Sequence, residues 1–197
     1  YVLASVIVDD FIITGSSLGA IRRFKTELTQ TWQMTDLGDL KWCLNLGVEY
    51  DREKCRLKIT QTNYINEMIE RYGLTDAHEV ATPMVPGHHL STANVPEADW
   101  PDVDPYPNMT GSLQHMRLTR PDICAALSSV CQFNKKGAHD GTHIAAVKRM
   151  LRYLKGTSTM GIEFRTNGRK PGDPWELQMY VDSDYANDRV GCTEIEN

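Results

Sequence analysis

The first hydrophobic stretches of the chain have the length and composition of β-strands. Residues 2–8 and 11–14 are rich in Val and Ile, and Asp9 and Asp10 stand between them. Two short apolar runs separated by polar residues predict a β-hairpin with the two aspartates at its tip. We expect the apolar side chains on either side of this tip to be at least partly buried.

Helical periodicity follows the first hairpin. Apolar residues recur at three- and four-residue spacing over residues 18–28, and the serines at 16 and 17 can cap the helix. The pattern changes back to strands at residues 42–50 and 56–60, with a polar turn at 51–54. This arrangement predicts a second hairpin.

A second amphipathic helix is predicted after residue 60. Thr62 can cap it, and Gly73 can end it. Its expected buried face consists of Ile65, Met68, Ile69 and Tyr72.

The middle of the chain lacks such periodicity. Six of the nine prolines fall between Pro83 and Pro107, so residues 80–107 are predicted to form an extended link along a surface. The remaining predicted elements are helices at 108–117, 121–134 and 142–155 and strands at 160–165 and 176–184. Together the elements predict an α+β fold, with antiparallel strands in residues 1–60, helices in 61–160 and a strand pair in 161–197.

Composition and charge make some classes of protein less favoured for this chain. The chain has 197 residues and a net charge of −5, which does not favour a free-standing nucleic-acid-binding domain. No run of eighteen apolar residues or signal peptide is present, so a membrane span is not expected. Five cysteines without metal-type spacing indicate reduced thiols in an intracellular protein. The chain starts without Met inside an apolar stretch, which suggests a fragment of a longer protein.

The aspartate pair allows two interpretations. Aspartates are common in turns, and one interpretation is that Asp9 and Asp10 are ordinary turn residues without a function. Two adjacent carboxylates beside apolar strands also repel each other unless a cation compensates, and Mg²⁺ prefers such oxygen ligands. Asp182, at the end of an apolar strand, has the same character and the same alternative, an ordinary strand terminus. His139 and His143 have no evident third ligand, so a metal site is not indicated there.

A cluster of basic residues lies on the last predicted helix. Lys148, Arg152 and Lys155 share one face, Arg149 lies beside them, and Leu151 and Leu154 share another face. A solvated helix face explains this pattern, and so does a surface that follows nucleic-acid phosphates. In either case the basic side chains are expected to form an exposed stripe.

Nine segments, in this order, resemble landmarks of the reverse transcriptase and ribonuclease H region of copia-type LTR retrotransposons. They are "VDDFIITGS", "MTDLGDLKW", "LGVEY", "TPMVPG", "GSL", "LTRPDI", "QF", "KRMLRYLKGT" and "YVDSDYAND". The chain departs from the family pattern at Ile7, where an aromatic residue is usual, and in "WCLNLGVEY", which carries two additional residues.

The resemblance implies a fold and a site. Residues 1–60 would be the C-terminal part of the polymerase palm, 61–160 the thumb and connection, and 161–197 a linker and the start of ribonuclease H. Asp9, Asp10 and Asp182 would be catalytic ligands of Mg²⁺ or Mn²⁺. The partner would be an RNA/DNA template-primer, contacted by Trp42 in the primer-supporting hairpin and by the basic helix.

The same resemblance leaves the activity of this chain open. Fingers, the first half of the palm and most of ribonuclease H would lie outside the sequence, so we expect the isolated chain to be inactive and to self-associate weakly through a sheet edge at residues 2–8. A non-catalytic relic that binds nucleic acid or protein is the alternative. The expected location is intracellular, in a cytoplasmic particle or the nucleus.

Overall fold

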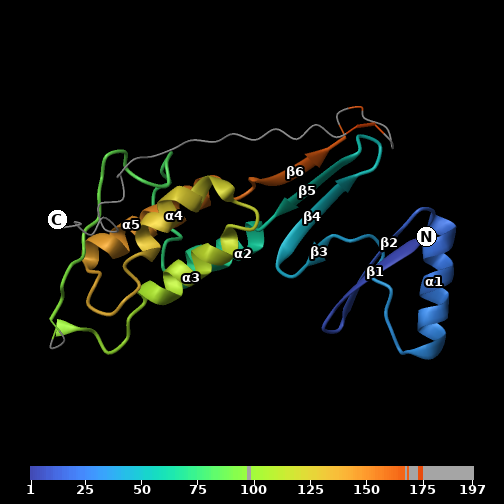
Figure 1. Ribbon diagram of the computed structural model, residues 1–197, viewed down its shortest axis with the longest axis horizontal. Coiled ribbons are helices and arrows are strands. Elements are labelled where there is room, and N and C mark those ends of the chain that lie inside the picture. Colours follow the sequence, from blue (N-terminus) through green and yellow to red (C-terminus); the bar gives the residue numbers. More distant parts are fainter. Residues whose placement is uncertain (97–98, 167, 169–172, 175–197) are drawn as a thin grey trace, which may run out of the picture. The chain divides into compact units, whose positions relative to one another are not determined.

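The computed structural model describes residues 1–96, 99–166, 168 and 173–174. The chain forms two compact units, Tyr1–Leu44 and Asn45–Asn197. Figure 1 shows the elements of each unit. The model confirms the general prediction of an α+β chain with antiparallel sheets.

The first unit is a hairpin followed by a helix. Strands β1 (Val2–Ile7) and β2 (Asp10–Gly15) pair antiparallel, with Ile7 opposite Asp10. Val8 and Asp9 therefore form a two-residue turn, and Val8 has the positive φ of 56° that such turns require. Helix α1 (Leu18–Thr31) begins where the Ser17 hydroxyl accepts a hydrogen bond from the Ala20 amide at 3.2 Å. The predicted hairpin and serine cap are confirmed.

The expected burial around the first hairpin tip is wrong in part. Val6 and Val8 are 58% and 89% exposed, and Phe11 is also exposed, although Ile7, Ile12 and Ile13 are half-buried. The physical reason is the small size of the unit, since two strands and one helix cannot bury both faces of the hairpin. The hairpin therefore presents apolar side chains close to its two aspartates.

The sheet of the second unit contains β4 (Leu46–Asp51), β5 (Arg56–Thr60) and β6 (Gly161–Arg165), all antiparallel. The predicted strand over residues 42–50 is wrong as a single element. Leu44 and Asn45 both have positive φ, 51° and 63°, and this turn separates β4 from the short strand β3 (Trp42–Cys43). The turn lies in the segment that carries two additional residues.

Strand β6 pairs with β5, although the two strands are about 100 residues apart in the sequence. The register places Thr60 opposite Gly161, and a Cβ on Gly161 would lie 2.1 Å from the Ile59 carbonyl oxygen. Only glycine permits this approach. The predicted strand at 176–184 lies outside the described residues.

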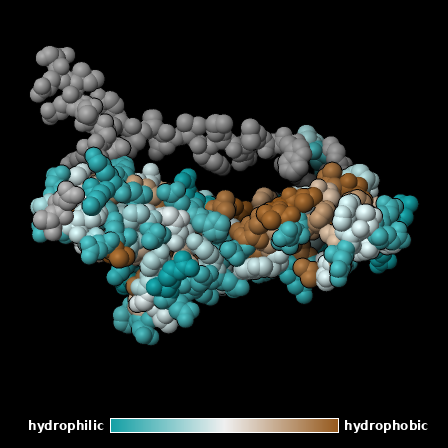
Figure 2. All heavy atoms as spheres, turned by 90° about the horizontal axis from the view of Figure 1, so that it is seen from below, coloured by the Kyte–Doolittle hydropathy of each residue, from teal (hydrophilic) through white to brown (hydrophobic). Residues whose placement is uncertain are grey.

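The sheet is amphipathic across β4, β5 and β6. Two cross-strand rows form its apolar face, Val48–Ile59–Ile162 and Tyr50–Leu57–Phe164. The other face carries two rows of charged residues, Glu49–Lys58–Glu163 and Asp51–Arg56–Arg165, and Arg56 pairs with Glu163 at 3.6 Å. Tyr50 and Phe164 are exposed, and Figure 2 shows apolar residues gathered in this region.

Four α-helices pack at one end of this sheet (Figure 1). They are α2 (Thr62–Arg71), α3 (Tyr106–Met116), α4 (Cys124–Cys131), preceded by the 3₁₀ turn η2 (Pro121–Ile123), and α5 (Gly141–Gly156). Their apolar faces form one core that includes Ile65, Met68, Leu113, Leu127, Leu151 and Leu154. The helical periodicity correctly predicted burial of Ile65, Met68, Ile69, Leu151 and Leu154, whereas Tyr72 is only half-buried.

The ends of α2 give one confirmed prediction and one error. Gly73 ends the helix with a φ of 64°, as predicted. Thr62 does not cap it, because Gln61 occupies the cap position. The Thr62 hydroxyl instead donates to the Ser158 carbonyl at 2.9 Å.

The described residues between 80 and 105 contain no α-helix or strand, but the predicted link to residue 107 is two residues too long because α3 begins at Tyr106. The Ala93 and Val95 amides donate to the carbonyls of Ala138 and Gly137, at 3.0 and 2.9 Å. These bonds hold an extended segment against the chain before α5, as predicted for a surface link. In the described residues, no helix is long and apolar enough to span a membrane.

Candidate functional site

The first hairpin presents its two aspartates to solvent. Asp9 is the second residue of the turn and Asp10 the first residue of β2, and both are exposed. Both residues are therefore accessible and lie near the hairpin tip, as predicted. The carboxylate oxygens are donors of the type that Mg²⁺ prefers, so the residues present fit such an ion.

The pair is not part of a larger acidic cluster within the described chain. In residues 1–96, 99–166, 168 and 173–174, no group of three or more His, Cys, Asp or Glu side chains could hold a metal ion. Asp182, the third predicted metal ligand, lies outside these residues. Trp42, the predicted nucleic-acid contact in β3, is 45% exposed and so accessible.

The basic face of α5 differs from the predicted exposed stripe. Lys148 is exposed, but Arg149, Arg152 and Lys155 are half-buried. Lys155 Nζ donates to the carbonyls of Thr75 and Ala77, at 2.6 and 2.9 Å. The expectation of a stripe of exposed cations is therefore wrong, although Leu151 and Leu154 pack inward as predicted.

The two arginines of this face bind the same segment. Arg152 Nε donates to the His78 carbonyl at 2.5 Å, and an Arg149 terminal nitrogen donates to the Thr82 hydroxyl at 3.0 Å. All these acceptors are uncharged. Within the described residues, none of the four cations of this face lies within ion-pair distance of a carboxylate. The face therefore fixes residues 75–82 and keeps its positive charge.

A buried arginine that sequence reasoning missed lies between α3 and α4. Arg120 is 1% exposed, and its guanidinium donates to both carboxylate oxygens of Asp122, at 2.9 and 2.7 Å. It also donates to the Thr157 carbonyl at 2.9 Å and to the Thr157 hydroxyl at 2.7 Å. Tyr153 donates to Asp122 at 2.8 Å.

Burial of Asp122 acts to raise its pKa, but the hydrogen bonds from Arg120 and Tyr153 outweigh burial and hold this pKa below its usual range. The carboxylate is therefore stabilised in its ionised form.

The two histidines have structural contacts. The ring nitrogens of His139 face the Phe133 carbonyl at 2.7 Å and the Asp104 carboxylate at 3.1 Å, and its ring stacks on Tyr106 at 4.0 Å. His143 belongs to the cap of α5, where its Nδ1 lies 3.2 Å from the Asp140 amide nitrogen and 2.9 Å from Asp140 Oδ1. Burial raises the pKa of Tyr106, whose hydroxyl donates to the Val130 carbonyl.

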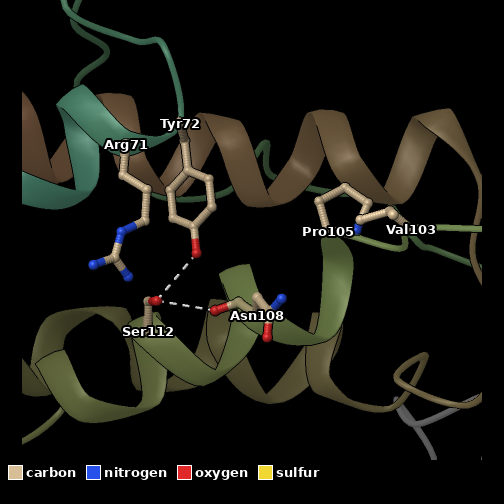
Figure 3. A pocket seen from close by; sticks show the side chains of 6 residues that line it. All are labelled: Arg71, Tyr72, Val103, Pro105, Asn108 and Ser112. Atoms are coloured by element: carbon tan, nitrogen blue, oxygen red, sulfur yellow. Dashed lines mark hydrogen bonds between the residues drawn. The ribbon is translucent and has the colours of Figure 1, made fainter.

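A shallow, open pocket of about 450 Å³ lies between the end of α2 and the start of α3. In Figure 3, the Tyr72 hydroxyl points at Ser112, whose own hydroxyl lies 2.9 Å from the Asn108 carbonyl. Arg71 lines the pocket from α2 but is paired with Glu67 at 2.8 Å. The hydroxyls of Tyr72 and Ser112 and the Arg71 guanidinium that line the pocket are therefore already paired.

The order of the elements, a hairpin with two exposed aspartates near its tip followed by a second hairpin and helices, agrees with the resemblance of the sequence to reverse transcriptases. The family model described as "Reverse transcriptase (RNA-dependent DNA polymerase)" matches residues 1–86. The chain is 34% identical to the retrovirus-related Pol polyprotein from transposon RE1 of Arabidopsis thaliana, over 93% of the chain and 12% of that protein. It is 32% identical to the corresponding polyprotein from transposon TNT 1-94 of Nicotiana tabacum, over 95% of the chain and 14% of that protein.

A shorter relative matches over most of its own length. The chain is 32% identical to the "Uncharacterized mitochondrial protein AtMg00810" of Arabidopsis thaliana, over 94% of the chain and 71% of that protein. No solved structure matches the chain. The chain belongs to the reverse transcriptase family of copia-type retrotransposon Pol polyproteins, and it spans 12% and 14% of the two polyproteins named above.

Proposed function

We propose that the chain is the part of a retrotransposon reverse transcriptase that carries the metal-binding hairpin of the polymerase site. The observation that supports this is the position of two adjacent, exposed aspartates, Asp9 in the two-residue turn and Asp10 at the start of β2. The two carboxylates would hold Mg²⁺ or Mn²⁺ and offset its charge. When bound, divalent ions in such a site activate the primer hydroxyl and stabilise the leaving pyrophosphate.

The remaining roles follow from the family membership and stay proposals. Trp42 would contact the primer end from β3. Asp182 would be the first carboxylate of a ribonuclease H site. The template-primer would be the partner, in an intracellular particle or the nucleus, and the complete polymerase site would require residues outside this sequence.

Lys148 is the strongest candidate for a phosphate contact on α5, because it alone among the predicted basic residues of this helix is exposed. Arg149, Arg152 and Lys155 hold residues 75–82 but keep their charge, since their acceptors are neutral. They would therefore contribute long-range attraction to phosphates, while Lys148 would make the direct contact.

The alternative function is a non-catalytic module that binds nucleic acid or a second chain. It is supported by the first sheet, in which the only described strands are β1 and β2. The outer edge of β1 has no partner strand among the described residues, and such an edge favours pairing with another chain. We propose weak self-association by this route.

Metal binding at the hairpin tip tests the proposed function directly. Mn²⁺ titration of the 197-residue chain, followed by electron paramagnetic resonance, should detect a site that Asp9→Asn and Asp10→Asn each weaken at least about tenfold, because each removes a charged ligand. Asp76→Asn, at an exposed position in the second unit, is the matched control and should leave the affinity unchanged. Equal affinity in all four proteins would refute the assignment.

A further inference from the structure

Arg120 connects parts of the chain that are distant in sequence. Its guanidinium donates four hydrogen bonds, two to Asp122 and two to Thr157, which lie 2 and 37 residues away. The Tyr153 ring also lies beneath the guanidinium, with its centroid 5.5 Å from Cζ. A buried guanidinium is tolerated only with such complete pairing, so the geometry around Arg120 is tightly constrained.

Thr157 marks the point where the chain leaves α5 for β6. It is the residue after the last turn of α5, and β6 begins at Gly161. Because Arg120 binds both the carbonyl and the hydroxyl of Thr157, it fixes the backbone and the side chain of this junction.

The residue before Arg120 fixes the other junction of the sheet. Thr119 is buried, and its hydroxyl donates to the side-chain oxygen of Gln61 at 2.8 Å. Gln61 is fully buried between β5 and α2, and its amide nitrogen donates to the His115 carbonyl at 3.3 Å. The end of β5 is therefore held by the segment that positions Arg120.

The two junctions are also joined directly. Thr62 donates to the Ser158 carbonyl, and Thr60 and Gly161 are opposite each other in the sheet. Figure 1 shows the sheet extending from the helices at this point. The direction of β5 and β6 relative to the helices thus depends on a few hydrogen bonds around residues 119 and 120.

We propose that Arg120 is a positioning residue, which sets the orientation of the β5–β6 strands on the helices through Thr157 and acts with Thr119 and Gln61. It does not touch substrate. Its effect on activity rests on the proposed function, in which the β4–β5 hairpin supports the primer end. Loss of Arg120 would loosen the sheet relative to the helices and weaken primer placement.

Hydrogen–deuterium exchange of the 197-residue chain tests the structural part without any activity. Arg120→Lys keeps the charge but loses the two-pronged contact. We expect the amides of residues 57–60 and 161–164 to exchange at least about tenfold faster, while mid-α5 amides such as that of Met150 change less than about threefold. Thr157→Val removes one acceptor and should produce the same pattern more weakly, which gives a second test if Arg120→Lys folds poorly.

The control is a core truncation away from the junctions. Val130→Ala removes buried methyl groups from α4 and should speed exchange in the helices and the sheet alike. If the exchange of Arg120→Lys and Thr157→Val follows this uniform pattern, Arg120 has only a general stabilising role and the proposal is wrong.

The functional part uses a Pol polyprotein reverse transcriptase that carries this segment. Arg120→Lys should raise KM for the template-primer more than it lowers kcat, whereas Asp9→Asn should abolish kcat. An inactive parent enzyme would count against the proposed function and leave the exchange result standing. Equal losses in kcat for Arg120→Lys and Val130→Ala, with unchanged KM, would overturn the role in primer placement.

Discussion

Lys155 Nζ lies 2.6 Å from the carbonyl oxygen of Thr75, eighty residues earlier in the chain, and 2.9 Å from that of Ala77. A side chain that resembles a phosphate-binding lysine in the sequence is therefore part of the tertiary structure. The neighbouring Lys148 is exposed, so the two lysines should respond differently to substitution.

Lys155→Met should destabilise the chain by about 1–3 kcal/mol, because it leaves two main-chain carbonyls without their charged donor. Lys148→Met should change the free energy of unfolding by less than about 0.5 kcal/mol, as is usual for exposed positions. Urea titration followed by circular dichroism measures both. Equal effects of the two substitutions would show that the contacts of Lys155 contribute nothing.

For nucleic-acid binding we expect Lys148 to matter more than Lys155, which is the reverse of their expected effects on stability. Lys148→Gln should reduce the slope of log affinity against log salt concentration for duplex by about 0.9, the value of one phosphate contact. Lys155→Gln should change the slope by less than half of this, because its ammonium group is bonded to carbonyls. Fluorescence anisotropy over a salt series checks both, and an unchanged slope in Lys148→Gln would support a solvated helix face without a binding role.

The cap of α5 should make stability depend on pH. The Thr142 hydroxyl, followed by His143, hydrogen-bonds Asp140 and holds the pKa of this carboxyl far below its usual range. Because the folded-state pKa is lowered, the stabilisation is complete above about pH 4 and is lost as the pH falls toward the folded-state pKa.

Asp140→Ala should therefore cost about 0.5–2 kcal/mol at pH 7 and less at about pH 3. Asp140→Asn is the matched control, since asparagine caps a helix without titrating. The difference in free energy of unfolding between wild type and Asp140→Asn should shift in favour of asparagine as the pH falls from about 5 to 3. A difference independent of pH would contradict this account.

Two glycines should respond with opposite sign to alanine substitution. A Cβ at Gly161 would meet the Ile59 carbonyl at 2.1 Å, whereas nothing lies within 4 Å of a Cβ at Gly111 in α3. Gly161→Ala must displace the β5–β6 pairing and should cost more than about 2 kcal/mol, within the range of severe backbone strain. Gly111→Ala should stabilise the helix by about 0.5–1 kcal/mol. Thermal unfolding of the two variants compares them directly.

Local patterns in the sequence predicted what local forces decide. The sequence predicted the hairpin around Asp9, the buried helix positions such as Leu151 and the end of α2 at Gly73. These features depend on the spacing of hydrophobic residues and on the backbone preferences of single residues, and both can be read directly from the sequence. The turn at Leu44 and Asn45 was missed because apolar residues flank Asn45 on both sides and its preference for turns was not given weight.

Contacts between residues that are distant in the sequence could not be predicted from local sequence patterns. Nothing near Arg120 in the sequence indicates that Thr157 supplies its acceptors, or that the carbonyls of Thr75 and Ala77 engage Lys155. A basic residue on a helix face has the same sequence pattern whether it meets water, phosphate or a carbonyl. The identity of the partner is a property of the tertiary fold.

The last prediction concerns the activity of the isolated chain. A two-metal site holds its ions about 3.5–4 Å apart, which requires carboxylates from more than one direction. Asp9 and Asp10 are adjacent on one hairpin, and the family resemblance assigns the opposing carboxylate to a palm strand outside this sequence. We therefore expect no primer extension and no cleavage of RNA–DNA hybrids by the 197-residue chain with Mg²⁺ or Mn²⁺, at levels above those of its Asp9→Asn and Asp182→Asn forms. In contrast, a chimera in which this chain replaces the matching segment of the RE1 polyprotein should extend primers, and Asp9→Asn should abolish that extension by removing a metal ligand. Activity of the isolated chain that disappears in Asp9→Asn would contradict the expectation and show that the hairpin completes its site without the remaining palm, for instance across the edge of β1 with a second copy.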